Sequence, residues 1–183
     1  MTLLDRRREV TGALVVVGAA LFVLLLSAVR GRVGQTAGVE SVGKRQAMAE
    51  MSLRTLEGGM WRLSEHRGEV VAVNLWATWC GPCREETPML VRAAQDLRAE
   101  GFAVVGVSLD DGDREAKVRA FRAQYGVGYP LAFPDAMSQM SAGLEGIPTT
   151  LLIDREGRVA KTYVGEMRER VLRSDVGELL GER

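Results

Sequence analysis

Two cysteines, Cys80 and Cys83, are the residues of this 183-residue chain best suited to chemistry, and they are its only cysteines. A structural disulfide framework uses several cysteines at longer spacing. A zinc site needs further Cys or His ligands, and His66 is the only histidine. A c-type haem attachment needs histidine directly after the second cysteine, where Arg84 stands. The pair therefore predicts a thiol–disulfide redox centre with no metal and no cofactor.

The predicted surroundings of the pair favour the same chemistry. Residues 70–75 form a continuous apolar run, typical of a strand buried on both faces, and a helix is predicted from the cysteine motif to about Glu100. A helix N-terminus stabilises a thiolate through unpaired backbone N–H groups and the helix dipole. We expect Cys80 to attack a target disulfide and Cys83 to resolve the mixed disulfide that forms.

The elements that must position this pair alternate between strands and helices over residues 52–183. They are predicted as a hairpin at 53–63, a strand at 70–75, the cysteine-motif helix, a strand at 102–108, a helix at 113–125, a strand at 131–133, a short helix at 136–142, a hairpin formed by 149–153 and 159–164, and a helix near 167–181. This alternation predicts an α/β fold with a mixed sheet.

Composition supports a single globular domain. Hydrophobic residues make up 46% of the chain and charged residues 26%, which is typical of globular proteins. The formal net charge is zero, which argues against nucleic acid as the main partner.

The first 51 residues have a different character. Residues 10–29 carry no charge, and as a helix of about 30 Å they match the thickness of a bilayer. A cleaved signal peptide is the alternative, but its apolar part is usually roughly 7–15 residues long. A retained transmembrane anchor is favoured. More arginines precede the run than follow it, which predicts that residues 1–9 are cytoplasmic. The glycine-containing polar segment 30–51 is predicted to be a linker.

The motif resembles a known family. Residues 73–88, VNLWATWCGPCREETP, are similar to the active-site segment of thioredoxin-like proteins, and most similar to the membrane-anchored TlpA/ResA/DsbE group of thiol–disulfide oxidoreductases, which serve cytochrome c biogenesis and related extracytoplasmic thiol reduction. The resemblance covers residues 52–183 and implies a thioredoxin-like fold: a central mixed sheet flanked by helices, with an N-terminal hairpin. The segment 109–134 resembles the strand–helix insertion of this group.

The resemblance also implies roles for individual residues. The segment 146–150, GIPTT, resembles the family's cis-proline loop, so Pro148 is expected to be cis and to lie against the cysteine pair. The backbone of Ile147 is then expected to pair with the substrate, and Trp79 to contact it beside Cys80.

One acidic residue is expected to assist the cysteines. Glu86 lies three residues after Cys83 on an adjoining face of the same helix, where the group uses an acid to tune the cysteine pKa values and to handle protons. Asn74 stands where small thioredoxins carry a buried aspartate, which makes Glu86 more important. Glu85 is expected to be a solvated neighbour.

These observations predict a membrane-tethered oxidoreductase whose catalytic domain lies on the periplasmic side of the bacterial cytoplasmic membrane. The dipeptide Gly81-Pro82 matches that of thioredoxin, whose potential of about −270 mV is far more reducing than that of DsbA, so a reductase is favoured. The resemblance implies a membrane electron donor of the CcdA or DsbD type and a disulfide-containing protein substrate, such as apocytochrome c.

Two alternatives remain open. A peroxiredoxin-like thiol peroxidase carries its cysteine in a Thr-x-x-Cys setting, and Thr78 is one residue out of step with that pattern. Copper-delivery proteins resembling Sco use Cys-x-x-x-Cys and a downstream histidine, and no histidine follows His66. A redox helper in copper-site assembly is compatible with the sequence.

Overall fold

The computed structural model describes residues 37–134 and 145–182. The predicted cytoplasmic segment 1–9, the anchor 10–29 and the short helix at 136–142 lie outside these residues. Within the described ranges, no helix is long and apolar enough to cross a membrane.

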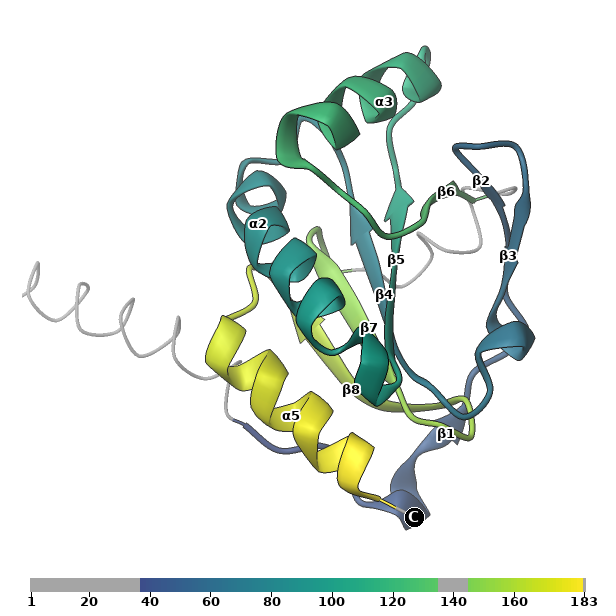
Figure 1. Ribbon diagram of the computed structural model, residues 1–183, viewed down its shortest axis with the longest axis vertical. Helices are drawn as coiled ribbons and strands as arrows, with labels where there is room; N and C mark the ends of the chain where they lie inside the picture. Colours follow the sequence, from purple (N-terminus) through teal and green to yellow (C-terminus); the bar gives the residue numbers. More distant parts are fainter. Residues whose placement is uncertain (1–36, 135–144, 183) are drawn as a thin grey trace, which may run out of the picture. The chain divides into compact units, whose positions relative to one another are not determined.

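A mixed sheet forms the centre of the domain (Figure 1). Its strands are β1 (Gln46–Ala47), β2 (Ser52–Thr55), β3 (Met60–Arg62), β4 (Val70–Trp76), β5 (Phe102–Ser108), β6 (Leu131–Phe133), β7 (Thr149–Ile153) and β8 (Arg158–Val164). They lie in the order β1-β8-β7-β4-β5-β6-β2-β3. The pairs β4–β5 and β5–β6 are parallel, and the other neighbours are antiparallel. The helices are α2 (Gly81–Asp96), α3 (Arg114–Tyr125) and α5 (Glu169–Gly181), with 3₁₀ turns η1 (Val42–Lys44), η2 (Leu63–His66) and η3 (Arg98–Glu100).

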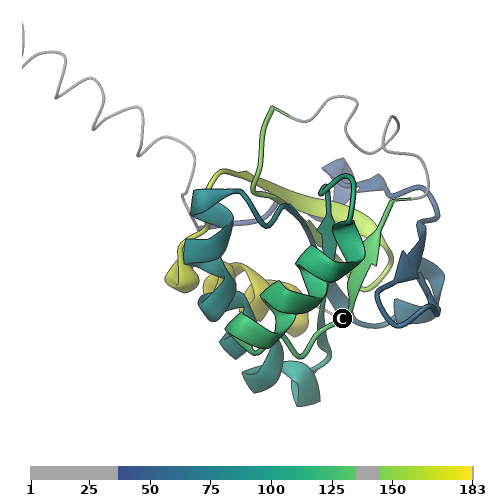
Figure 2. The same ribbon diagram turned by 90° about the horizontal axis from the view of Figure 1, so that it is seen from above.

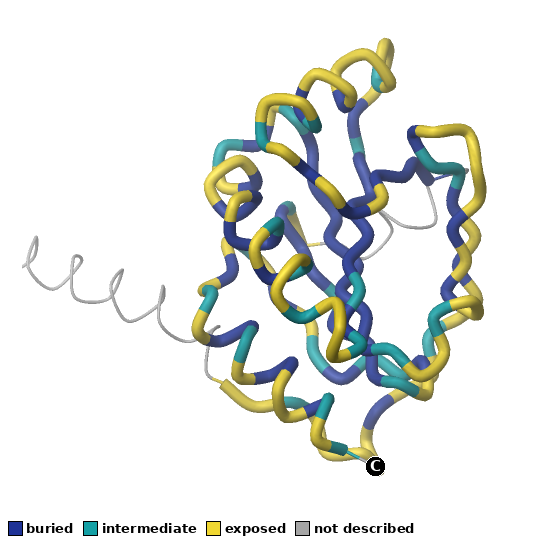
Figure 3. The backbone as a smooth tube through the Cα atoms, in the orientation of Figure 1, coloured by how far each residue is buried: buried dark blue, intermediate teal, exposed yellow. Residues whose placement is uncertain are grey.

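The two faces of the sheet are covered by different elements, because successive side chains of a strand point to opposite faces. Val70 and Ala72 of β4 belong to a core cluster that includes the buried residues of α2, α3 and α5. Val71 and Val73 belong to a second cluster with the β2–β3 hairpin. The helices and the hairpin therefore lie on opposite faces, as Figure 2 shows from above, and burial is concentrated in the central strands (Figure 3).

The predicted α/β fold with a mixed sheet is confirmed within the described residues. Both predicted hairpins are antiparallel pairs, β2–β3 and β7–β8, and the predicted strands at 70–75, 102–108 and 131–133 are present. The helix predicted to reach Glu100 ends as an α-helix at Asp96 and continues as η3. Gly101 then reverses the chain with φ = 93°, a conformation that side chains disfavour.

The structure corrects the prediction of a linker over residues 30–51. In the described part of that segment, β1 pairs with β8, and the compact unit begins at Ala37 rather than at residue 52. The Arg45 guanidinium is buried and bonded through Nη1 to Asp154 at 3.1 Å and to Glu182 at 2.6 Å. The segment is polar, so its sequence has no apolar period. It is held to the domain by the β1–β8 pairing and by ion pairs of Arg45 with partners more than one hundred residues later.

Candidate active site

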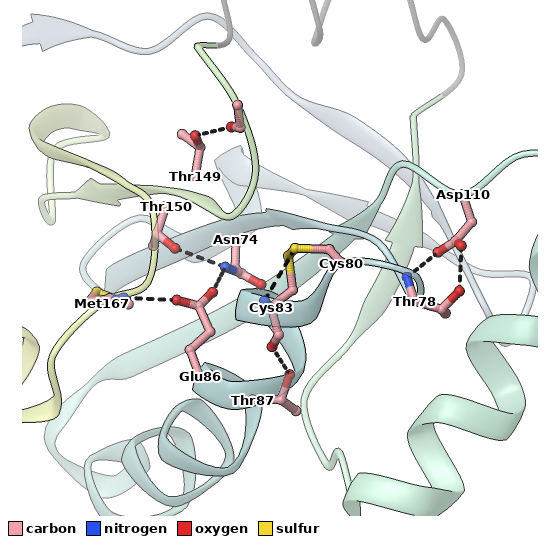
Figure 4. The surroundings of a disulfide bond; sticks show 11 residues. Asn74, Thr78, Cys80, Cys83, Glu86, Thr87, Asp110, Thr149, Thr150 and Met167 are labelled. Carbon is pink, nitrogen blue, oxygen red and sulfur yellow. Dashed lines mark hydrogen bonds between the residues drawn. A yellow bond between two sulfur atoms is a disulfide. The ribbon is translucent and has the colours of Figure 1, made fainter.

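Cys80 and Cys83 form a disulfide at the N-terminus of α2, with an S–S distance of 2.04 Å (Figure 4). Cys80 is the N-cap residue, and its Sγ accepts a hydrogen bond from the backbone N–H of Cys83 at 3.2 Å. Pro82, which has no N–H to satisfy, fits the first helical turn. Cys80 is 5% exposed and Cys83 is 1% exposed. Both cysteines are buried in the disulfide form, and their roles as attacker and resolver stay predictions.

The residues predicted to contact a substrate lie on two loops. Trp79, immediately before Cys80, is 64% exposed, which is unusual for a large apolar side chain. The Ile147–Pro148 peptide bond is cis, as predicted. Pro148 is buried, and its carbonyl oxygen accepts a hydrogen bond from Gly165 N at 2.8 Å. Ile147 packs against the core cluster that contains both cysteines. The substrate-binding roles of Trp79, Ile147 and Pro148 stay predictions.

Glu86 carries a carboxyl group that burial removes from water. Glu86 is only 2% exposed, whereas the neighbouring Glu85 is exposed. Burial raises the pKa of Glu86 to about 7, and the charge of Glu166 adds to the rise. Hydrogen bonds from the Met167 backbone and the Asn74 side chain oppose it. A carboxyl group that titrates near neutrality, one helical turn from Cys83, is suited to accept or release a proton during thiol exchange.

Asn74 positions that carboxyl group. Its Nδ2 donates to Glu86 Oε1 at 2.8 Å and to Thr150 Oγ1 at 2.9 Å, and Met167 N donates to Glu86 Oε2 at 3.1 Å (Figure 4). From the sequence, Asn74 was interpreted only as a replacement of the buried aspartate of small thioredoxins, with no predicted contact to Glu86. The alternation along β4 could have identified the contact, because Asn74 shares its face with Val70 and Ala72, the face covered by α2.

Asp110, which the sequence analysis did not select, holds the loop that leads to Cys80. Its buried carboxylate accepts the Thr78 backbone N–H at 2.9 Å, the Thr78 hydroxyl at 2.6 Å and the Ser108 hydroxyl at 2.9 Å. The usable signal was the position of Asp110 after β5, since the carboxyl ends of the parallel strands β4 and β5 lie at one edge of the sheet.

The described residues contain no group of three or more His, Cys, Asp or Glu side chains placed to hold a metal ion.

The chain combines a mixed central sheet, a cysteine pair at the start of α2 and a cis-proline loop. This combination places it in the class of thioredoxin-like proteins. The AhpC/TSA family model matches residues 44–164, and the chain belongs to this family. Within it, the chain is 31% identical over 163 residues to thiol-disulfide oxidoreductase ResA of Bacillus subtilis, covering 88% of this chain and 87% of the relative.

Solved structures agree with this assignment. A secreted thiol-disulfide isomerase from Corynebacterium glutamicum is similar with a TM-score of 0.71 and 26% identity, covering 82% of this chain and 95% of that chain. A thiol:disulfide interchange protein of the thioredoxin family from Chlorobium tepidum has a TM-score of 0.69 and 26% identity, covering 77% and 100%. The chain is a thiol–disulfide oxidoreductase of the ResA type.

Proposed function

We propose that the chain is a membrane-tethered reductase of polypeptide disulfides on the extracytoplasmic side of the bacterial cytoplasmic membrane. The observation that carries the proposal is the Cys80–Cys83 disulfide at the start of α2, with the buried Glu86 one turn away. In the dithiol form, the Cys80 thiolate attacks a substrate disulfide and releases one substrate thiol. The Cys83 thiolate then attacks Cys80 Sγ and releases the second. Two electrons and two protons pass to the substrate, and the enzyme disulfide forms.

The location and partners rest on the sequence. The uncharged run 10–29 has the length of a membrane span, and the arginines before it favour a cytoplasmic N-terminus. A reductase outside the cytoplasm needs a source of electrons, and a membrane donor of the CcdA or DsbD type supplies them. The ResA and DsbE resemblance favours apocytochrome c as the substrate, and a copper-site protein is the second candidate. The three similar proteins described above are named as a thiol-disulfide oxidoreductase, a thiol:disulfide interchange protein and a thiol-disulfide isomerase, so the peroxidase alternative gains no support from them.

Trapping tests this function. A Cys83→Ser variant expressed with its native partners is expected to accumulate mixed disulfides between Cys80 and its substrates, because the resolving thiol is absent. These adducts should be recovered in the membrane fraction and should disappear on reduction. Identification of apocytochrome c among them selects the haem pathway, and copper-site proteins select the alternative. The matched control is the double variant Cys80→Ser, Cys83→Ser, which should trap nothing. Absence of adducts to Cys80 in the single variant would contradict dithiol exchange.

The reductive direction has its own test. We expect the Cys80–Cys83 couple to equilibrate near the thioredoxin value of about −270 mV, since both share the Gly-Pro dipeptide. The measurement is the oxidised fraction of the full chain in defined dithiol and disulfide buffers at pH 7. A potential near the value of about −120 mV found for DsbA would assign the protein to disulfide formation instead.

A further inference from the structure

A hollow of about 370 Å³ lies beside the redox centre, between the cysteine motif and α3. One wall contains Thr78 and Arg84, which stand two residues before Cys80 and directly after Cys83. The other wall is a single face of α3, with residues at positions 117, 120, 121, 124 and 125. We call this hollow the α3 groove. The groove therefore adjoins the segment that carries Cys80, on which a polypeptide joined to Cys80 through a disulfide would lie.

The charge of the α3 groove is one-sided. Its lining contains two exposed cations, Arg84 and Lys117, and no acidic side chain among the described residues. Arg84 makes no ion pair within the described part of the chain, whereas Arg92 and Arg173, on α2 and α5, are paired with Glu169. Among residues 37–134 and 145–182, Lys117 donates to the carbonyl oxygen of Asp111, at 3.2 Å, and to no other acceptor, which leaves two of its three donor hydrogens available. The nearest acidic group behind the lining, the Asp110 carboxylate, is buried and occupied by hydrogen bonds from Thr78 and Ser108, so the exposed charge of the groove is positive and favours an anion.

The floor and one wall of the groove are held in place by buried neighbours. The ring of Phe121 lies 4.3 Å from that of Trp76 and 4.4 Å from that of Tyr125, measured between centroids. Thr78 is held by two hydrogen bonds to the buried Asp110. An apolar floor between cationic walls, preformed in this way, costs little reorganisation when a ligand binds.

We propose that the α3 groove binds an acidic side chain of the polypeptide whose disulfide Cys80 attacks. The inference deepens the proposed function and rests on it, because it assigns part of substrate selection to Arg84 and Lys117. The carboxylate lies between the two cations, and the apolar part of the same segment packs on Phe121 and Tyr125. Binding there places the substrate disulfide for attack and adds nothing to the exchange chemistry itself.

The test compares peptide disulfides that differ at one position, Glu, Gln or Lys, moved stepwise away from the bridged cysteine. With the full chain, kcat/KM for the best-placed Glu peptide is expected to exceed that of the Gln peptide about fivefold at low salt, the effect of two exposed ion pairs. The preference should vanish at high ionic strength. Lys117→Gln, which keeps Arg84, should reduce the preference to about twofold, and Lys117→Glu, which adds a charge opposite to that of Arg84, should abolish it. Arg119→Gln is the matched control, since Arg119 is an exposed cation on α3 outside the groove lining, and it should keep the wild-type preference.

Two further readouts separate this inference from the proposed function. Hydroxyethyl disulfide, which carries no charge, reports the exchange chemistry alone. If it is reduced while the Glu and Gln peptides react alike at every position, the groove proposal is overturned and the oxidoreductase stands. If no disulfide is reduced, the proposed function fails, and the groove is judged by binding of a cysteine-free Glu peptide to the full chain. Binding that Lys117→Gln weakens and Arg119→Gln does not supports the groove, and absence of binding overturns it.

Discussion

Replacing Cys80 with serine is expected to abolish reduction of a peptide disulfide, because a serine hydroxyl is not ionised near neutral pH and cannot attack sulfur in place of a thiolate. Cys80 is the N-cap of α2 and receives the Cys83 N–H at 3.2 Å, so the same donor can stabilise its thiolate. Replacing Cys83 instead should leave the first attack intact and stop turnover at the mixed disulfide. The measurement is release of peptide thiol, followed through a single turnover and then at steady state.

The two serine variants should therefore differ in kind. Cys83→Ser releases at most one equivalent of thiol per enzyme, and Cys80→Ser releases none. Thermal unfolding of both variants, compared with reduced wild-type protein, shows whether each is folded. If a folded Cys80→Ser variant still reduces the peptide, Cys83 is the attacking thiol and the assignment of that role to Cys80 is wrong.

Replacing Glu86 with glutamine is expected to slow turnover by about 10²–10⁴-fold, the range for loss of a general acid–base group. Burial raises the pKa of Glu86 to about 7, so the carboxyl group changes charge within the working pH range. We expect the wild-type profile of kcat/KM against pH to contain an inflection near 7 that is absent in Glu86→Gln. Glu85→Gln, an exposed neighbour on the same helix, is the matched control and should retain both rate and profile.

The same carboxyl group should make the stability of the oxidised protein depend on pH. Its pKa is raised on folding from an ordinary 4.5 to about 7, so the folded state holds a proton that the unfolded state releases. The contribution of Glu86 to the free energy of unfolding is therefore fully present below pH 4.5 and falls by about 3 kcal/mol as the pH rises to 7. Glu86→Gln should lack this decline, measured as the difference from wild type in urea unfolding between pH 4 and pH 8.

Asn74→Ala gives an intermediate case. It removes one donor to the ionised form of Glu86 while keeping the carboxyl group, so the inflection in the activity profile should move to higher pH. If Asn74→Ala leaves the inflection unchanged, or if Glu86→Gln keeps it, the inflection belongs to another group, and the proton-handling role of Glu86 is wrong.

The sequence by itself determined the redox pair, its place at a helix N-terminus and most of the strands and helices along the chain. These features are local, because the Cys-x-x-Cys spacing, the apolar run of β4 and the turn glycines each determine structure within a few neighbouring residues. The cis state of Pro148 was also predictable, but only through the resemblance of its loop to a family, since most X–Pro bonds are trans.

Only the tertiary structure decided how the pair is supported. The Glu86 carboxylate accepts hydrogen bonds from Asn74 and Met167, which are 12 and 81 residues away in the sequence. Asp110 accepts a hydrogen bond from Thr78, 32 residues away. Arg45 lies in the segment predicted to be a linker, and its bond to Asp154, 109 positions later, attaches that segment to the domain. Buried polar groups must find partners wherever the fold brings them, because an unpaired group in the interior costs about 1–3 kcal/mol. Such partners are chosen by proximity in space, so the sequence can indicate the face or sheet edge on which a polar residue lies, but not the partner that it finds there.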